Sequence, residues 1–140
     1  METKKEIALD EKKIIIPKEF GIEPETIIYP VLDPRYPDVA FLYPEAAFEE
    51  LAEGFMAKLQ KDLRDNKITQ KEYNELLRKF VAECSFSDEE LDEMRSIFLD
   101  DLIISKLKLV DNALVVLEDN KIVLCKDEET YNEYSKTKIK

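Results

Sequence analysis

Two long stripes of apolar residues in the middle of the chain constrain its fold most. In both stripes the apolar positions lie three or four residues apart, which places them on one face of a helix. The first stripe is Phe48, Leu51, Ala52, Phe55, Met56, Leu59 and Leu63. The second is Tyr73, Leu76, Leu77, Phe80, Val81 and Cys84. Because only Asp65–Ile68 separates them, the pattern predicts two long helices that form an antiparallel hairpin.

Residues suited to helix starts support this prediction. Pro44 suits a first helical turn, and acidic residues after it favour the positive end of the helix dipole. Thr69 and Glu72 form a capping-box pattern at the start of the second helix. Ser87 and Glu90 form another, which predicts a third helix. Its apolar positions would be Leu91, Met94, Ile97 and Phe98.

The N-terminal third is typical of strands and turns. Ile14–Ile16 is a β-branched run that ends at Pro17. Further along, Thr26–Tyr29 and Val39–Tyr43 flank the proline-rich segment Pro30–Asp38, which predicts a pair of strands. Prolines at the strand ends favour edge positions in a sheet.

The C-terminal third repeats this character. Leu102–Ile104 is predicted to be a strand, and Ala113–Leu117 with Lys121–Cys125 is predicted to form a hairpin around Glu118–Asn120. Asp127–Tyr134 begins with acidic residues and is predicted to be a short helix.

The two ends also align with each other. A shift of 88 positions places Ile14–Lys18 on Leu102–Lys106, and Ile27–Ile28 on Val115–Val116. The order of the predicted elements agrees as well, which suggests two related copies around a pseudo-two-fold axis. The predicted fold class is α+β, with tandem hairpin halves and a central helical hairpin. We expect one domain over residues 1–140, consisting of a first half (1–65), central helices (66–101) and a second half (102–140).

Composition narrows the possible functions. The chain has no histidine and only two glycines, which removes the commonest general base and any glycine-rich phosphate loop. Cys84 and Cys125 lie far apart, and both are expected to be buried, reduced thiols. We therefore expect no metal site, no cofactor and no enzymatic activity. The net charge of −11 repels nucleic acid and anionic membranes, although a local basic patch can still bind DNA.

Three stretches resemble a known family. Leu9–Phe20, with Asp10, the apolar run and Pro17, resembles the opening of MraZ proteins, which belong to the AbrB-like swapped-hairpin superfamily. Leu42–Pro44 followed by Phe48–Leu51 resembles the family's start of a helix. Leu114–Tyr134 resembles the second hairpin and closing helix. The likeness covers both ends of the chain and leaves out the middle.

The resemblance implies a cytoplasmic bacterial transcription regulator that associates with the nucleoid. It also implies self-association into a homo-oligomer, with DNA contacted by a basic loop in each half. In this sequence the matching basic residues are Lys12 and Lys13, supported by Lys4, Lys5 and Lys18.

The sequence departs from the family in these loops. The expected Gly-Arg is missing at Lys12 and Lys13, and lysine lacks the bidentate fork with which arginine reads bases. The 88-residue shift places Asp100 and Asp101 at the equivalent position of the second half, where two acids would repel phosphate.

Two functions therefore stay open. The first is a divergent MraZ-like DNA-binding regulator that uses the five lysines. The second is an acidic protein-interaction module on the same scaffold, antitoxin-like, a DNA mimic or an assembly partner, which binds a basic protein and no DNA. No membrane partner is expected, since the start Met1–Lys13 has no apolar leader and no apolar run is long enough to span a bilayer.

Overall fold

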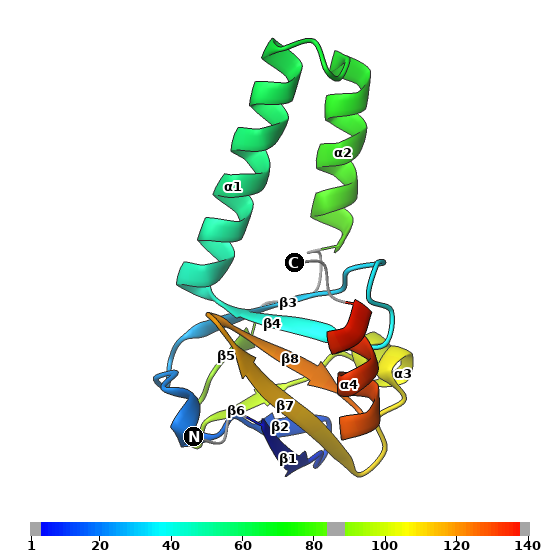
Figure 1. Ribbon diagram of the computed structural model, residues 1–140. Coiled ribbons are helices and arrows are strands. Elements are labelled where there is room, and N and C mark those ends of the chain that lie inside the picture. Colours follow the sequence, from blue (N-terminus) through cyan, green and yellow to red (C-terminus); the bar gives the residue numbers. More distant parts are fainter. Residues whose placement is uncertain (1–3, 84–88, 138–140) are drawn as a thin grey trace.

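The computed structural model describes residues 4–83 and 89–137, which form a mixed α+β fold with a helical hairpin standing on a sheet (Figure 1). The strands are β1 (Lys4–Ala8), β2 (Lys13–Ile15), β3 (Ile27–Val31), β4 (Ala40–Pro44), β5 (Glu89–Glu90), β6 (Ser96–Phe98), β7 (Asn112–Glu118) and β8 (Lys121–Cys125). The helices are the 3-10 turn η1 (Lys18–Phe20) and α1 (Glu45–Arg64), α2 (Gln70–Glu83), α3 (Asp101–Leu107) and α4 (Glu128–Thr137).

The main sheet is antiparallel, and strands from the first and second halves of the chain are interleaved in it. Its strand order is β1-β7-β8-β4-β3-β5. Strand β1 from the N-terminal part pairs with β7 from the C-terminal part, with Lys4 opposite Val116. Strand β5 makes the reciprocal pair with β3. The strand order is therefore symmetric: read from the other edge, β5 takes the place of β1, β3 that of β7, and β4 that of β8.

A separate two-stranded ribbon joins β2 and β6, and it shows the same exchange. Ile14 lies opposite Ile97 at its centre. The Ile16 N–H donates to the Arg95 carbonyl at 2.8 Å, and the Leu99 N–H donates to the Lys12 carbonyl at 2.7 Å. Each half thus makes the same backbone bond to the other, just beyond the ribbon.

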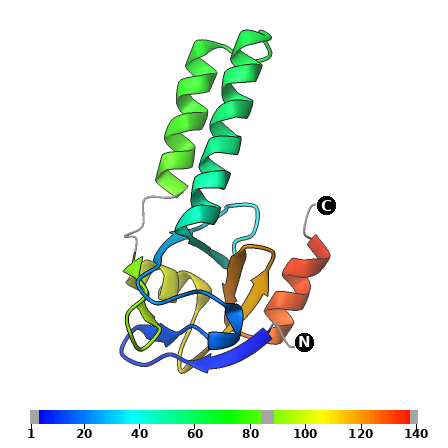
Figure 2. The same ribbon diagram turned by 90° about the vertical axis from the view of Figure 1, so that its left-hand side faces the viewer.

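Both faces of the main sheet are buried, because its strands contain runs of apolar residues whose side chains point to the two faces in turn. On β7, Ala113 and Val115 face the core formed with the ribbon, η1 and α3. Leu114 and Val116 face the opposite core, which is covered by α4 and the start of α1. Figure 2 shows α4 lying on one side of the sheet. The ribbon is consequently held against the sheet by the larger core.

Tyrosines fasten α4 to the sheet. The hydroxyls of Tyr131 and Tyr134 both donate to the Glu118 carboxylate, Tyr134 at 3.3 Å. The pKa of each phenol is raised, first by burial and then by the neighbouring carboxylate. The predicted C-terminal hairpin and the helix that follows it are both confirmed.

The predicted helical hairpin is confirmed as well. Thr69 accepts from the Glu72 N–H at 3.1 Å, and Glu72 accepts from the Thr69 N–H at 3.0 Å, as a capping box requires. Phe55 and Phe80 stack with their ring centroids 4.3 Å apart and join α1 to α2. The N-terminal strand pair is confirmed as β3 and β4. Cys84 lies outside the described residues.

The predicted third helix is wrong. Ser87 lies outside the described residues, and Leu91–Phe98 forms a turn and strand β6 instead. The Asp92 carboxylate accepts from the Ser96 N–H at 2.8 Å and from its hydroxyl at 2.6 Å, and Arg95 has a φ of 67°. A left-handed residue interrupts a right-handed helix. The apolar residues here are therefore spaced as in a helix, but they belong to a turn and to strand β6.

The predicted strand over Leu102–Ile104 is also wrong, because this segment forms α3. The Asp100 carboxylate caps the helix by accepting from the Leu102 N–H at 2.8 Å. Ile103 and Leu107, four residues apart, are buried on one face. The 88-residue shift therefore matched strand β2 to a helix, whereas the ribbon pairs Ile14 with Ile97.

Candidate functional site

The predicted DNA-contacting loop is a two-residue turn between β1 and β2. The Asp10 N–H donates to the Lys13 carbonyl at 2.9 Å, and the Lys13 N–H donates back at 2.8 Å. Glu11 and Lys12 have φ values of 50° and 69°. This is the pattern of a type I′ turn, which favours Asn and Gly, so the sequence holds two ordinary side chains in a left-handed backbone.

Lys12 is exposed in this turn, but its charge is compensated. Its Nζ lies 2.8 Å from the Asp101 Oδ1 at the start of α3. Asp101, which the 88-residue shift aligns with Lys13, thus lies beside Lys12, the neighbouring lysine of the first turn. The pair joins the first turn to the helix that follows the second turn.

The predicted lysines of β1 do not extend a basic surface from this turn. Lys4 Nζ lies 3.2 Å from Glu128 Oε1 and 5.3 Å from the centre of the Tyr131 ring. Lys5 Nζ lies 3.3 Å from Glu19 Oε2. Because neighbouring residues of a strand point to opposite faces, Lys4 and Lys5 lie on opposite sides of the sheet. Each therefore joins a separate acidic neighbour.

The two remaining predicted lysines are exposed. Lys13 stands on the outward face of the ribbon, opposite Phe98, and Lys18 begins η1. The pKa of Asp92 is lowered mainly by the hydrogen bonds from Ser96, and Lys13 contributes to the same effect. The structure thus brings Lys12 and Lys13 together and places Lys4, Lys5 and Lys18 elsewhere.

Sequence reasoning missed the equivalent turn of the second half, which runs from Asp92 to Ser96. The left-handed residue here is Arg95, whose guanidinium donates to the backbone carbonyls of Ile22 and of Ile16, the latter at 3.4 Å. The signal was present in the sequence, because Leu91-Asp92-Glu93 repeats Leu9-Asp10-Glu11. The apolar spacing of the following residues concealed it.

The surroundings of the two turns are acidic. Six carboxylates and three basic side chains belong to the turns and the start of α3. The acids are Asp10, Glu11, Asp92, Glu93, Asp100 and Asp101, and the bases are Lys12, Lys13 and Arg95. Lys12 is paired with Asp101, and Arg95 is folded onto backbone carbonyls. The two turns and the start of α3, which carry two of the five predicted DNA contacts, therefore have a net negative charge.

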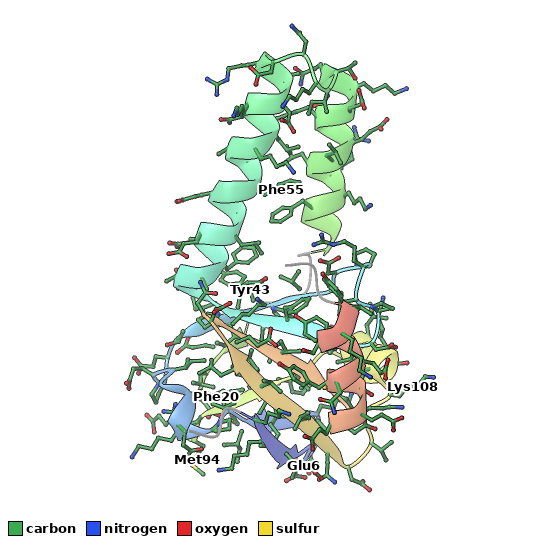
Figure 3. All side chains as sticks on the ribbon, in the orientation of Figure 1. Glu6, Phe20, Tyr43, Phe55, Met94 and Lys108 are labelled. Atoms are coloured by element: carbon green, nitrogen blue, oxygen red, sulfur yellow. The ribbon has the colours of Figure 1, made fainter. Side chains whose placement is uncertain are left out.

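A cleft of about 490 Å³ lies at the other end, between the helical hairpin and the sheet. Its walls include Tyr43 and Phe55, which Figure 3 labels at the base of α1 and between the two helices. Arg35 in the β3–β4 connection donates to Asp33 at 2.7 Å on the rim. Burial raises the pKa of Asp33, but the hydrogen bonds and charge of Arg35 outweigh it and lower the pKa overall.

The thiol, metal ligands and apolar helices of the described residues offer no further candidate site. Cys125 is a free, buried thiol, and burial raises its pKa to about 12, so it is a poor nucleophile at neutral pH. No group of three metal-ligating side chains occurs within residues 4–83 and 89–137. In that same part of the chain, no helix is both long and apolar enough to cross a bilayer.

Neither a protein-family model nor a curated protein sequence matches this chain.

Proposed function

We propose that this protein is an acidic protein-interaction module built on a divergent MraZ-like, AbrB-like swapped-hairpin scaffold, and that it acts through contacts to a basic protein. One observation carries the proposal. Where the scaffold would present a basic loop from each half, Lys12 is paired with Asp101 and Arg95 is bound to backbone carbonyls.

The scaffold assignment rests on the exchange of strands between the two ends of the chain. Strands β1 and β5 each pair with the hairpin of the other half. A single chain with two such halves supplies internally what a swapped dimer obtains from a second copy. The sequence resemblance of Leu9–Phe20 to MraZ openings supports the same assignment.

The electrostatics favour a basic protein over DNA. Each phosphate contact gains affinity when a cation displaces condensed counterions, and an acidic surface provides no such exchange. Lys13 and Lys18 are the exposed predicted lysines without a carboxylate in direct contact in the described structure. The negative charge of Asp92, which interacts with the positive charge of Lys13, further weakens any attraction to phosphate.

The proposal is tested by a gel shift at low salt with the duplex upstream of the gene and with an unrelated duplex. We expect no shift with either. The Asp101→Asn variant, which frees Lys12, is expected to shift DNA weakly at most, and Glu75→Gln on α2 is its matched charge control. A salt-sensitive shift of the unmodified protein that Lys12→Ala with Lys13→Ala abolishes would overturn the proposal.

A second candidate is a divergent DNA-binding transcription regulator that works as a homo-oligomer. It is favoured by the exposure of the β1–β2 turn and of Lys13, at the end of the molecule away from the hairpin (Figure 1). Many weak contacts repeated around an oligomer add up to useful avidity. Light scattering on the gel-shift sample separates the candidates, because this one requires a large oligomer that binds DNA.

A further inference from the structure

Exposed apolar side chains gather at the ribbon. The described residues include six large apolar side chains that are exposed, and four of them lie on the ribbon or beside it. They are Met94, Leu102, Ile15 and Phe98, with exposed fractions of 75%, 56%, 55% and 41%. The other two are Leu76 on α2 and Val110 after α3. Such a concentration on one surface is typical of an interaction site.

The register of the ribbon places two of these four side chains, Ile15 and Phe98, on one face. Ile14 and Ile97 point into the core, so Ile15 and Phe98 point outward, as diagonal neighbours on a face that they share with Lys13 and Ser96. We call the strip formed by Ile15, Met94, Phe98 and Leu102 the ribbon face.

The two remaining members extend the strip at its ends. Met94 lies in the turn beyond Ile15, where the Ile16 N–H bonds the Arg95 carbonyl. Figure 3 shows Met94 projecting from the molecule at the end opposite the helical hairpin. Leu102 lies beyond Phe98, in the first turn of α3, where Leu99 bonds Lys12.

Carboxylates border the ribbon face at both ends. Asp10 and Glu11 stand at the first turn, with Asp100 and Asp101 beside it at the start of α3. At the second turn stand Asp92 and Glu93, both exposed. Lys13 lies on the same face, but the six carboxylates outnumber it, because Lys12 is paired with Asp101 and Arg95 is bound to backbone carbonyls. An apolar strip with a border of net negative charge is complementary to a segment that combines apolar and basic side chains.

We propose that the ribbon face is the docking site for a partner segment in which apolar residues are flanked by lysine or arginine. This inference rests on the proposed function and specifies where the partner binds and what its chemistry is. A second copy of the chain fits poorly, because it would bring an equally acidic border against this one. An anionic membrane is disfavoured for the same reason.

The test uses the full-length protein and fluorescence anisotropy with a labelled peptide of leucine and lysine in amphipathic spacing. A serine–lysine peptide keeps the charge without the apolar groups, and a leucine–glutamate peptide keeps the apolar groups with the opposite charge. We expect the leucine–lysine peptide to bind at least tenfold more tightly than the serine–lysine peptide, and the leucine–glutamate peptide not to bind.

Protein variants locate the site. Ile15→Ser with Phe98→Ser is expected to weaken binding of the leucine–lysine peptide about tenfold or more, because burying such side chains is the main gain. Leu76→Ser, an exposed apolar position on the hairpin, is the matched control and is expected to leave binding unchanged. Glu11→Gln with Glu93→Gln is expected to weaken binding and flatten its salt dependence, whereas Glu53→Gln with Glu75→Gln on the hairpin is not. Circular dichroism checks that each variant is folded.

The outcomes separate this inference from the proposed function. Peptide binding that ribbon-face and hairpin variants weaken equally would overturn the ribbon face as the site and leave an interaction module. Binding indifferent to leucine or to lysine would overturn the stated partner chemistry. A self-association that Phe98→Ser abolishes would instead identify a second copy as the occupant. Duplex DNA that competes with the peptide through Lys13 would contradict the proposed function itself.

Discussion

The two turns of the ribbon occupy equivalent places in the exchanged halves, yet they use their side chains differently. Each turn has a basic residue in a left-handed conformation, Lys12 with φ of 69° and Arg95 with φ of 67°. Lys12 reaches outward to a carboxylate, whereas Arg95 folds inward onto backbone carbonyls. An equal backbone position in the two halves therefore does not imply an equal function.

The difference also explains how each turn is stabilised. The first turn has two backbone hydrogen bonds between Asp10 and Lys13. The second is one residue longer, and the Asp92 carboxylate replaces part of that backbone pairing by accepting from Ser96. In the first half the turn is closed by backbone alone, and in the second half by side chains as well.

The largest expected effect tests whether the halves contribute equally to stability. Ile14→Ala and Ile97→Ala each remove a buried side chain from the centre of the ribbon. Each is expected to lower the free energy of unfolding by about 2–5 kcal/mol, as measured by urea denaturation. Ile15→Ala, on the outward face, serves as the control and is expected to cost much less. Unequal losses at Ile14 and Ile97 would show that one half dominates.

The next prediction concerns the two left-handed residues and has opposite signs. Arg95→Gly relieves backbone strain but removes charged hydrogen bonds to Ile22 and Ile16, so we expect a loss of about 1.5–3 kcal/mol. Lys12→Gly removes only an exposed ion pair and relieves the same strain, so we expect a gain of up to about 1 kcal/mol. Thermal denaturation measures both. Losses at both positions would mean that the Lys12 pair matters more than its exposure implies.

A smaller effect is expected where the halves begin their short helices. Asp100 caps α3 with its carboxylate, whereas η1 follows Pro17 and has no side-chain cap. Asp100→Ala is expected to cost about 1 kcal/mol in urea denaturation. Asp100→Asn retains the capping oxygen and is expected to cost little. If the asparagine variant loses as much as the alanine variant, the charge rather than the cap is responsible.

The smallest effect is the pH dependence that the second turn contributes. Because hydrogen bonds from Ser96 lower the pKa of Asp92 in the folded state, its carboxylate stabilises the fold at neutral pH. That contribution is present above the unfolded pKa of about 3.9 and is lost as pH falls through the folded pKa. Asp92→Asn is therefore expected to be less stable than the unmodified protein at pH 7 and equally stable in strong acid. A difference that persists in acid would assign the effect to packing.

Much of the fold could be predicted from sequence where one periodicity dominates. The stripe from Phe48 to Leu63 admits one interpretation, and α1 follows it. The run Lys121–Cys125 is apolar, short and preceded by turn formers, and it forms β8. These elements could be predicted because α1 has its apolar residues on one face and β8 pairs with β7, the strand that precedes it in sequence.

The rest could not be predicted, because short apolar runs gain their structure from distant partners. Ile97 is in a strand because it lies opposite Ile14, and no local signal distinguishes it from a helical position. Leu102–Ile104 is rich in β-branched residues, but the Asp100 cap and the burial of Ile103 and Leu107 favour a helix. At the candidate site, Lys12 was identified but its pairing with Asp101 depends on tertiary structure.

The exchange of strands also determines when the protein can fold. Strand β1 has its partner in β7, with Lys4 opposite Val116, so β1 leaves the ribosome long before the strand with which it pairs. Contacts so distant in sequence slow folding and leave strand edges exposed meanwhile. The helical hairpin of α1 and α2, whose contacts are local, can form during this wait. Synthesis of the chain, rather than formation of its helices, is then expected to set the time at which the sheet closes.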